Sequence, residues 1–120
     1  MSMRALEPGA YMSQGKVFNG MVFLAGQVAE DTSLDTAGQT RQVLARIDDL
    51  LAQAGTSKAR LLPAQIFLKD VDDWAAMNAV WSQWIAGHVP PARATVEARL
   101  AGPGFRIEIV IVAALGEEKA

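Results

Sequence analysis

Short stretches in which hydrophobic and polar residues alternate predict several β-strands along this chain. Residues 16–28 contain two runs of β-forming residues around Asn19-Gly20. This dipeptide readily adopts positive φ, so the pattern predicts a tight hairpin. Residues 60–70 predict a third strand. Its apolar residues are expected on one face: Leu62, Ala64, Ile66 and Leu68. Two more strands are predicted, over residues 93–100 and 105–115.

Two other segments carry apolar residues at the spacing of an amphipathic helix. The first covers residues 36–55. Thr36 and Gln39 fit a capping box at its start, and Gly55 fits a left-handed stop at its end. The second covers residues 71–88. The predicted buried stripes are Val43, Leu44, Ile47, Leu50, Leu51 and Ala54 in the first helix, and Trp74, Met77, Trp81, Trp84 and Ile85 in the second.

The predicted order is strand, strand, helix, strand, helix, strand, strand, which indicates one α+β domain over residues 1–120. Two helices can cover only one face of such a sheet. The last strand, however, is apolar on both of its alternating faces, which is typical of a strand buried on both sides. A second copy of the chain would bury the open face, so we expect a homo-oligomer. The alternative is a curled sheet that covers itself.

Composition narrows the classes of function. Hydrophobic residues make up 51% of the chain, which argues against intrinsic disorder. The absence of cysteine excludes disulfides and thiol catalysis, and with a single histidine it argues against a zinc site. A formal net charge of -2 gives no general attraction to nucleic acid. Neither a membrane-spanning run nor a signal peptide is evident, so we expect a cytoplasmic protein.

Two charged residues in the last two strands are candidates for chemistry. Arg93 follows two prolines at the start of a strand. It is either part of a solvated face or a planar fork for a carboxylate. Glu108 lies in an otherwise apolar strand, where an isolated carboxylate is costly. It either pairs with a neighbouring arginine or serves as a general base that orients water.

The stretch "PARATVEARLAGPGFRIEI" resembles the signature of the Rid family, also called the YjgF family, of reactive imine and enamine deaminases. In this signature a small residue precedes the arginine of one strand, and a glutamate lies between aliphatic residues in the next. The similarity extends upstream to "FLAGQV", to "LLPAQIFLKDVDDWAAMNAVW" and to the first helix. The resemblance implies a chorismate-mutase-like fold of the bacterial trimeric type, with two helices on one face of a mixed sheet. It further implies a homotrimer with ligand clefts between subunits.

The resemblance also implies roles for single residues. Arg93 matches the arginine that binds the substrate carboxylate, and Glu108 matches the glutamate that handles the attacking water. Gly26, Thr95 and Tyr11 match segments that line the cleft. The implied reaction converts 2-imino or 2-enamino acids, such as 2-aminoacrylate, to 2-keto acids and ammonia. It needs no cofactor and no metal, because the imine is already electrophilic.

This chain departs from the archetypal branch of the family at two positions near the expected cleft. Ala25 replaces a serine before Gly-Gln, and Thr95 replaces a cysteine two residues after the arginine. These departures indicate a divergent branch and leave the physiological substrate open. The alternative function is a non-catalytic protein that binds or senses a small carboxylate. Some family members are also described as endoribonucleases or translation inhibitors, against which the negative net charge argues here.

Overall fold

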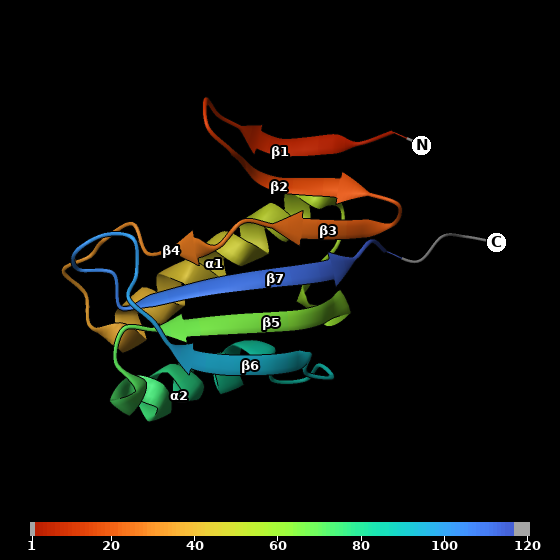
Figure 1. Cartoon of the computed structure of the whole chain (residues 1–120). Coiled ribbons are helices and arrows are strands. Elements are labelled where there is room, and N and C mark those ends of the chain that lie inside the picture. Colours follow the sequence, from red (N-terminus) through yellow and green to blue (C-terminus); the bar gives the residue numbers. More distant parts are fainter. Residues whose placement is uncertain (1, 117–120) are drawn as a thin grey trace.

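The computed structural model describes residues 2–116, and in this part of the chain a seven-stranded sheet carries two α-helices (Figure 1). The strands are β1 (Arg4–Pro8), β2 (Ser13–Phe18), β3 (Met21–Leu24), β4 (Gln27–Val28), β5 (Leu61–Leu68), β6 (Ala92–Glu97) and β7 (Ile107–Ala114). The helices are α1 (Thr36–Ala54) and α2 (Trp74–Ile85), with short 3₁₀ turns at Lys58–Arg60 and Val71–Asp73.

The sheet is mixed, with the strand order β1-β2-β3-β7-β5-β6, and β4 also pairs with β7 (Figure 1). Only β5 and β6 run parallel; the other pairs described are antiparallel. Asn19 and Gly20 both have positive φ at the turn between β2 and β3, which confirms the predicted hairpin. The short strands β1 and β4 were not predicted. Each pairs with a neighbouring strand that supplies its hydrogen-bond partners.

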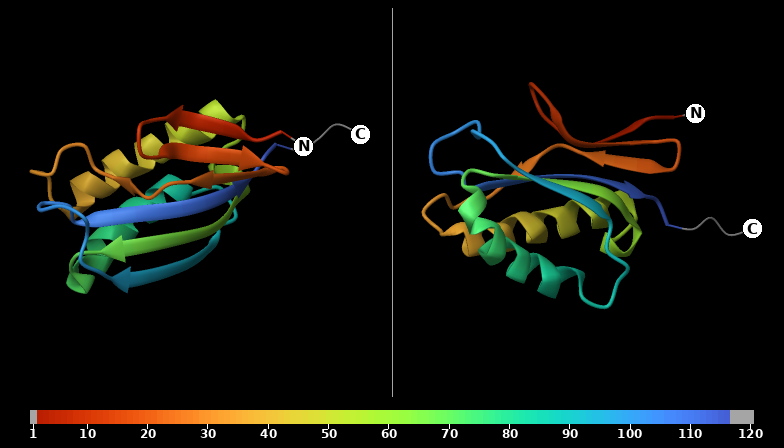
Figure 2. Two further views of the ribbon diagram at one scale, coloured as in Figure 1. Left: turned by 45° about the horizontal axis from the view of Figure 1, so that its top comes forward. Right: turned by 60° about the horizontal axis from the view of Figure 1, so that its bottom comes forward.

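Both helices pack on the same face of the sheet (Figure 2). At the sheet edge, Arg4 and Glu7 of β1 bond to α1 through the carbonyl oxygen of Ala54 and the guanidinium of Arg46. The core lies between the helices and the sheet. Its fully buried side chains include Leu44, Ile47 and Leu50 of α1, and Ile107, Ile109 and Ile111 of β7. The predicted α+β arrangement, a mixed sheet with two helices on one face, is therefore confirmed.

The predictions for Leu62 and Gln39 are wrong. Leu62 does not share the buried face of β5, because a register irregularity between Leu61 and Ala64 turns its side chain outward, where 44% of it is exposed. Gln39 does not complete a capping box at α1. The helix is capped by Asp35, whose carboxylate accepts a hydrogen bond from the amide of Gly38.

Gln39 instead ties two loops together from a fully buried position. Its amide nitrogen donates to the carbonyl oxygens of Leu34 (3.1 Å) and Gly104 (2.9 Å), and its oxygen accepts from the backbone N–H of Arg106 (2.9 Å). These bonds join the segment before α1 to the loop between β6 and β7. They therefore fix the point where β7 begins, just before Glu108.

The face of the sheet opposite the helices carries exposed apolar side chains. Phe23 and Val112 are paired neighbours on β3 and β7. Phe23 is 45% exposed, and Val96 on β6 is 48% exposed. Neither helix covers this face (Figure 2). The sequence-based expectation of an open apolar face is confirmed for residues 2–116, and its burial by further copies of the chain stays a prediction.

Candidate functional site

Arg93 lies on β6, the edge strand of the sheet, and its side chain is on the helix side. The strand register pairs Arg93 with Ala64 and Thr95 with Ile66. Ala64 and Ile66 are buried beneath the helices. Since paired residues of adjacent strands share a face, Arg93 and Thr95 face α2 at the border of the core.

Three residues of α2 hold the guanidinium of Arg93. Its Nη1 donates a 2.8 Å hydrogen bond to Oδ1 of Asn78. The central carbon, Cζ, lies over the rings of Trp74 and Trp81, at 5.7 and 5.4 Å from their centroids. These residues follow one another at helical spacings of four and three, so they form a single stripe on α2. Arg93 therefore rests on a surface built by one helix face.

The guanidinium of Arg93 is partly removed from solvent. Burial lowers the pKa of the Arg93 guanidinium from its ordinary value. No described residue between 2 and 116 forms an ion pair with it. A hollow of about 320 Å³ opens beside it. The lining residues are Asn78, Trp81, Ser82, Ile85, Pro90 and Pro91. An unpaired guanidinium beside an apolar hollow suits a carboxylate with an organic substituent.

Glu108 lies on the other face of the sheet. It pairs with Phe67 of β5 and Val28 of β4, and its side chain is half-buried. None of the residues from 2 to 116 forms an ion pair with it, so the pairing with a neighbouring arginine is not found within one chain. The carboxylate packs directly against Gly26. A Cβ on Gly26 would lie 2.8 Å from Cδ of Glu108 and would overlap its Oε2.

The predicted site residues therefore fall into separate groups. Arg93 and Thr95 share the helix-side face of β6, whereas Gly26 and Glu108 touch on the open face. Tyr11 is fully exposed in the turn between β1 and β2. One chain does not bring Arg93 and Glu108 together, because the sheet itself separates them.

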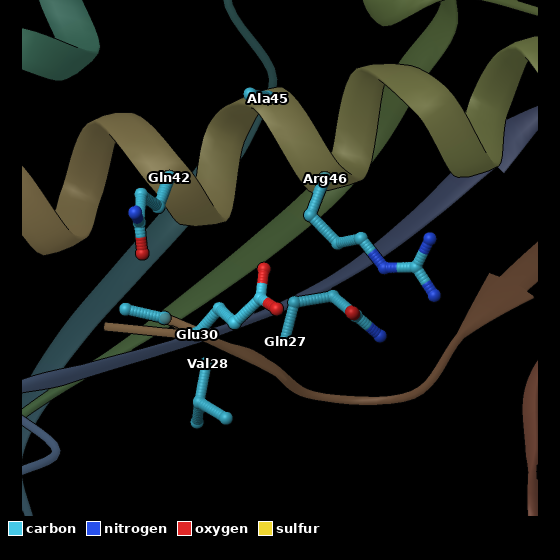
Figure 3. Close-up of a pocket in the computed structure, with 7 residues that line it drawn as sticks. Gln27, Val28, Glu30, Gln42, Ala45 and Arg46 are labelled. Atoms are coloured by element: carbon cyan, nitrogen blue, oxygen red, sulfur yellow. The ribbon is translucent and has the colours of Figure 1, made fainter. Parts of the chain in front are cut away.

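A second, larger hollow lies elsewhere in the described residues. A groove of about 660 Å³ runs between α1 and the segment around β4, where Gln42 and Arg46 of the helix face Gln27 and Glu30 (Figure 3). Arg46 is already paired there with Glu7 and Asp49. The buried Gln27 belongs to the helix side of the sheet, and Glu108 to the open face, so this groove is separate from both groups above.

From their spacing the tryptophans of α2 were predicted to pack in the core, and this prediction is wrong for Trp74. Trp81 is buried, but Trp74 is 43% exposed, and both contact Arg93. The regular stripe of residues 74, 78 and 81 was visible in the sequence. The missing information was the β5-β6 register, which places Arg93 over that stripe.

Within residues 2–116 there is no cluster of three histidine or acidic side chains suited to a metal ion. Among the same residues, neither helix has the length and apolarity needed to cross a lipid bilayer.

The chain is similar to known proteins over nearly its full length. Residues 2–115 match the family model described as "Endoribonuclease L-PSP". A RutC family protein of Haemophilus influenzae is 45% identical over 94% of this chain and 98% of its own length. The RutC family protein YoaB of Escherichia coli is 40% identical over 96% of this chain and its own full length. A crystal structure of a YjgF family protein from Neisseria meningitidis matches with a TM-score of 0.92 and 44% identity, covering 98% of both chains.

Proposed function

Because this chain belongs to the endoribonuclease L-PSP family, which includes the YjgF and Rid proteins and shares the chorismate-mutase-like fold, we propose that it hydrolyses reactive 2-imino acids. The products are the 2-keto acid and ammonia. One observation carries this proposal. Arg93 presents a partly buried guanidinium whose Nε and Nη2 have no partner within residues 2–116, beside a hollow large enough for a small organic acid. Such a fork matches the two oxygens of a carboxylate.

The reaction proceeds by addition and elimination. Arg93 holds the substrate carboxylate through two parallel hydrogen bonds. Glu108 orients a water molecule and accepts its proton as the oxygen attacks the C=N carbon. The resulting tetrahedral carbinolamine carries a hydroxyl and an amino group on one carbon. Glu108 completes that amino group by passing the proton taken from water to the imine nitrogen. It then takes the hydroxyl proton and delivers it to the amino nitrogen, so that the C–N bond breaks, ammonia leaves and the oxygen becomes the ketone.

The proposed site needs two copies of the chain. Arg93 and Glu108 lie on opposite faces of one sheet, so an arginine from one copy must meet a glutamate from its neighbour. A closed ring of copies related by rotation repeats one such contact at every interface. We propose a homotrimer whose open apolar faces, including Phe23 and Val96, point inward.

The same geometry suits a simpler alternative, a trimer that binds a small carboxylate at Arg93 without turning it over. Among similar solved structures, one from Salmonella typhimurium is described as a "putative translation initiation inhibitor" and one from Entamoeba histolytica as a "putative endoribonuclease L-PSP". With a net charge of -2, this chain offers little general attraction to RNA. Of these candidate functions, imine hydrolysis is the one that gives a role to both Arg93 and Glu108.

A coupled assay tests the proposal. An amino-acid oxidase generates 2-imino acids from a panel of amino acids, and semicarbazide traps those that persist. We expect the wild type to reduce the trapped product, and Arg93→Ala to lose this effect. Loss of a desolvated bidentate contact costs on the order of 2–5 kcal/mol. If the wild type is an intact trimer, binds pyruvate and leaves every imine untouched, the binding function replaces the catalytic one.

A further inference from the structure

The face of α2 beneath Arg93 is built from two aromatic rings and one amide. Trp74, Asn78 and Trp81 lie on one stripe, and each contacts the guanidinium. Two indoles therefore lie within about 6 Å of a single arginine. Trp74 in particular is 43% exposed and contributes little to the core. The contact of its ring with the guanidinium of Arg93 gives Trp74 a role outside the core.

We propose that Trp74 and Trp81 are positioning residues that set the affinity and orientation of Arg93 toward a 2-keto or 2-imino carboxylate. This inference rests on the proposed function of Arg93. Asn78 occupies Nη1, and Cζ lies over both indole rings. The edge formed by Nε and Nη2 has no hydrogen-bond partner in the described chain from 2 to 116. That edge is the one a carboxylate can engage with two parallel bonds.

The rings act on binding in two ways. An arginine side chain loses rotamer freedom when it grips a ligand, and a surface that already holds it reduces that loss. Aromatic rings also displace water from one side of the cation, which strengthens its hydrogen bonds to an anion. Cation–π attraction is favourable at the contacts observed, both within about 6 Å. Removing either ring should therefore weaken carboxylate binding even though neither ring touches the carboxylate.

The third tryptophan provides a matched control. Trp84 lies on the same helix, stacks near Trp81 with centroids 5.3 Å apart, and donates to Asp48. Its cationic neighbour is Lys58. Trp84→Leu thus removes an indole of equal size from α2 that does not itself contact Arg93.

The test measures pyruvate and 2-ketobutyrate binding by calorimetry in four variants. We expect Trp74→Leu and Trp81→Leu to weaken binding by about 3- to 30-fold, the range that cation–π energies allow. Trp81→Phe keeps an aromatic face and should recover most of the affinity. Trp84→Leu should bind as the wild type does. Because Trp74 is 43% exposed whereas Trp81 is buried, Trp74→Leu should retain the fold and carries the test if Trp81→Leu does not fold.

Fluorescence gives a signature that a purely structural role would not produce. A carboxylate that neutralises Arg93 changes the field at Trp74 and Trp81, so emission should change on binding. That change should persist in Trp84→Phe and disappear when Trp74 and Trp81 are both replaced by phenylalanine. Unchanged affinity in folded Trp74→Leu and Trp81→Leu would overturn the inference. If the wild type binds no keto acid, the role of Arg93 fails and this inference fails with it.

Discussion

Gly26→Ala is a small change with a large expected effect on catalysis. A methyl group at this position would overlap Oε2 of Glu108 and lie 2.8 Å from its Cδ. Non-bonded carbon atoms prefer separations of roughly 3.5–4.0 Å, so the carboxylate must move by about 1 Å. The obstructed atoms belong to the end of a flexible side chain. Rotation of Glu108 therefore relieves the overlap, and the fold should lose little stability.

The displacement should appear in turnover. A misplacement of about 1 Å costs on the order of 100-fold in rate when the moved group orients a reactant. We therefore expect kcat for imine hydrolysis to fall about 100-fold in Gly26→Ala, while pyruvate binding at Arg93 changes little. The measurement is steady-state hydrolysis of an oxidase-generated imine, with calorimetry on the same samples.

Two comparisons isolate the cause. Gly116→Ala adds a methyl group that meets only a carbonyl oxygen, Gly55 O, at 3.6 Å, and should be silent. In a Glu108→Ala background the carboxylate is gone, so Gly26→Ala should cost little more. Full additivity of the two losses would refute the reasoning, because it would mean that Gly26 acts independently of Glu108. Wild-type kcat in Gly26→Ala would refute it equally.

Substitutions of Glu108, Gln39 and Glu7 give three further predictions. Glu108→Gln should keep keto-acid affinity but slow imine hydration, because the amide cannot accept the proton of water; equal turnover would remove Glu108 from the mechanism. Gln39→Leu leaves buried polar partners unsatisfied and should lower the free energy of unfolding by roughly 1–3 kcal/mol or more in urea denaturation at fixed protein concentration. Hydrogen bonds from Arg46 and Gln53 lower the pKa of Glu7 from 4.5 to about 2. A carboxylate whose pKa is lower in the folded than in the unfolded state stabilises the fold at pH values above its unfolded pKa. This stabilisation is lost as the pH falls toward about 2. The free energy of unfolding of Glu7→Gln should therefore be lower than that of the wild type at pH 7 and equal to it in acid. A stability difference that does not vary with pH would contradict the last prediction.

Local patterns in the sequence were sufficient for most of the fold. Helical spacing placed Ile47 and Leu50 in the core, and Asn19-Gly20 marked the hairpin. The short strands β1 and β4 were not recognised, because five residues and two residues are too few to show a clear alternation. The face of Leu62 was misjudged because a single register irregularity reverses the alternation that the sequence implies.

The candidate site shows the same division between local and long-range information. Arg93 and Glu108 were identified from their residue types and neighbours, and their placement on β6 and β7 agrees with that. Sequence reasoning did not reveal that they occupy opposite faces, since this follows from how both strands pair with β5. The contact of Gly26 with Glu108 and the stripe beneath Arg93 likewise depend on strand register.

The proposed site is shared between copies of the chain, with Arg93 from one copy and Glu108 from the next. Subunit mixing tests it directly. Arg93→Ala and Glu108→Gln are each prepared as inactive proteins, unfolded together in equal amounts and refolded. Random assembly into a ring pairs an intact arginine with an intact glutamate at about a quarter of the interfaces, so about a quarter of wild-type imine hydrolysis should return. A mixture that re-forms oligomers and stays inactive would contradict the shared site.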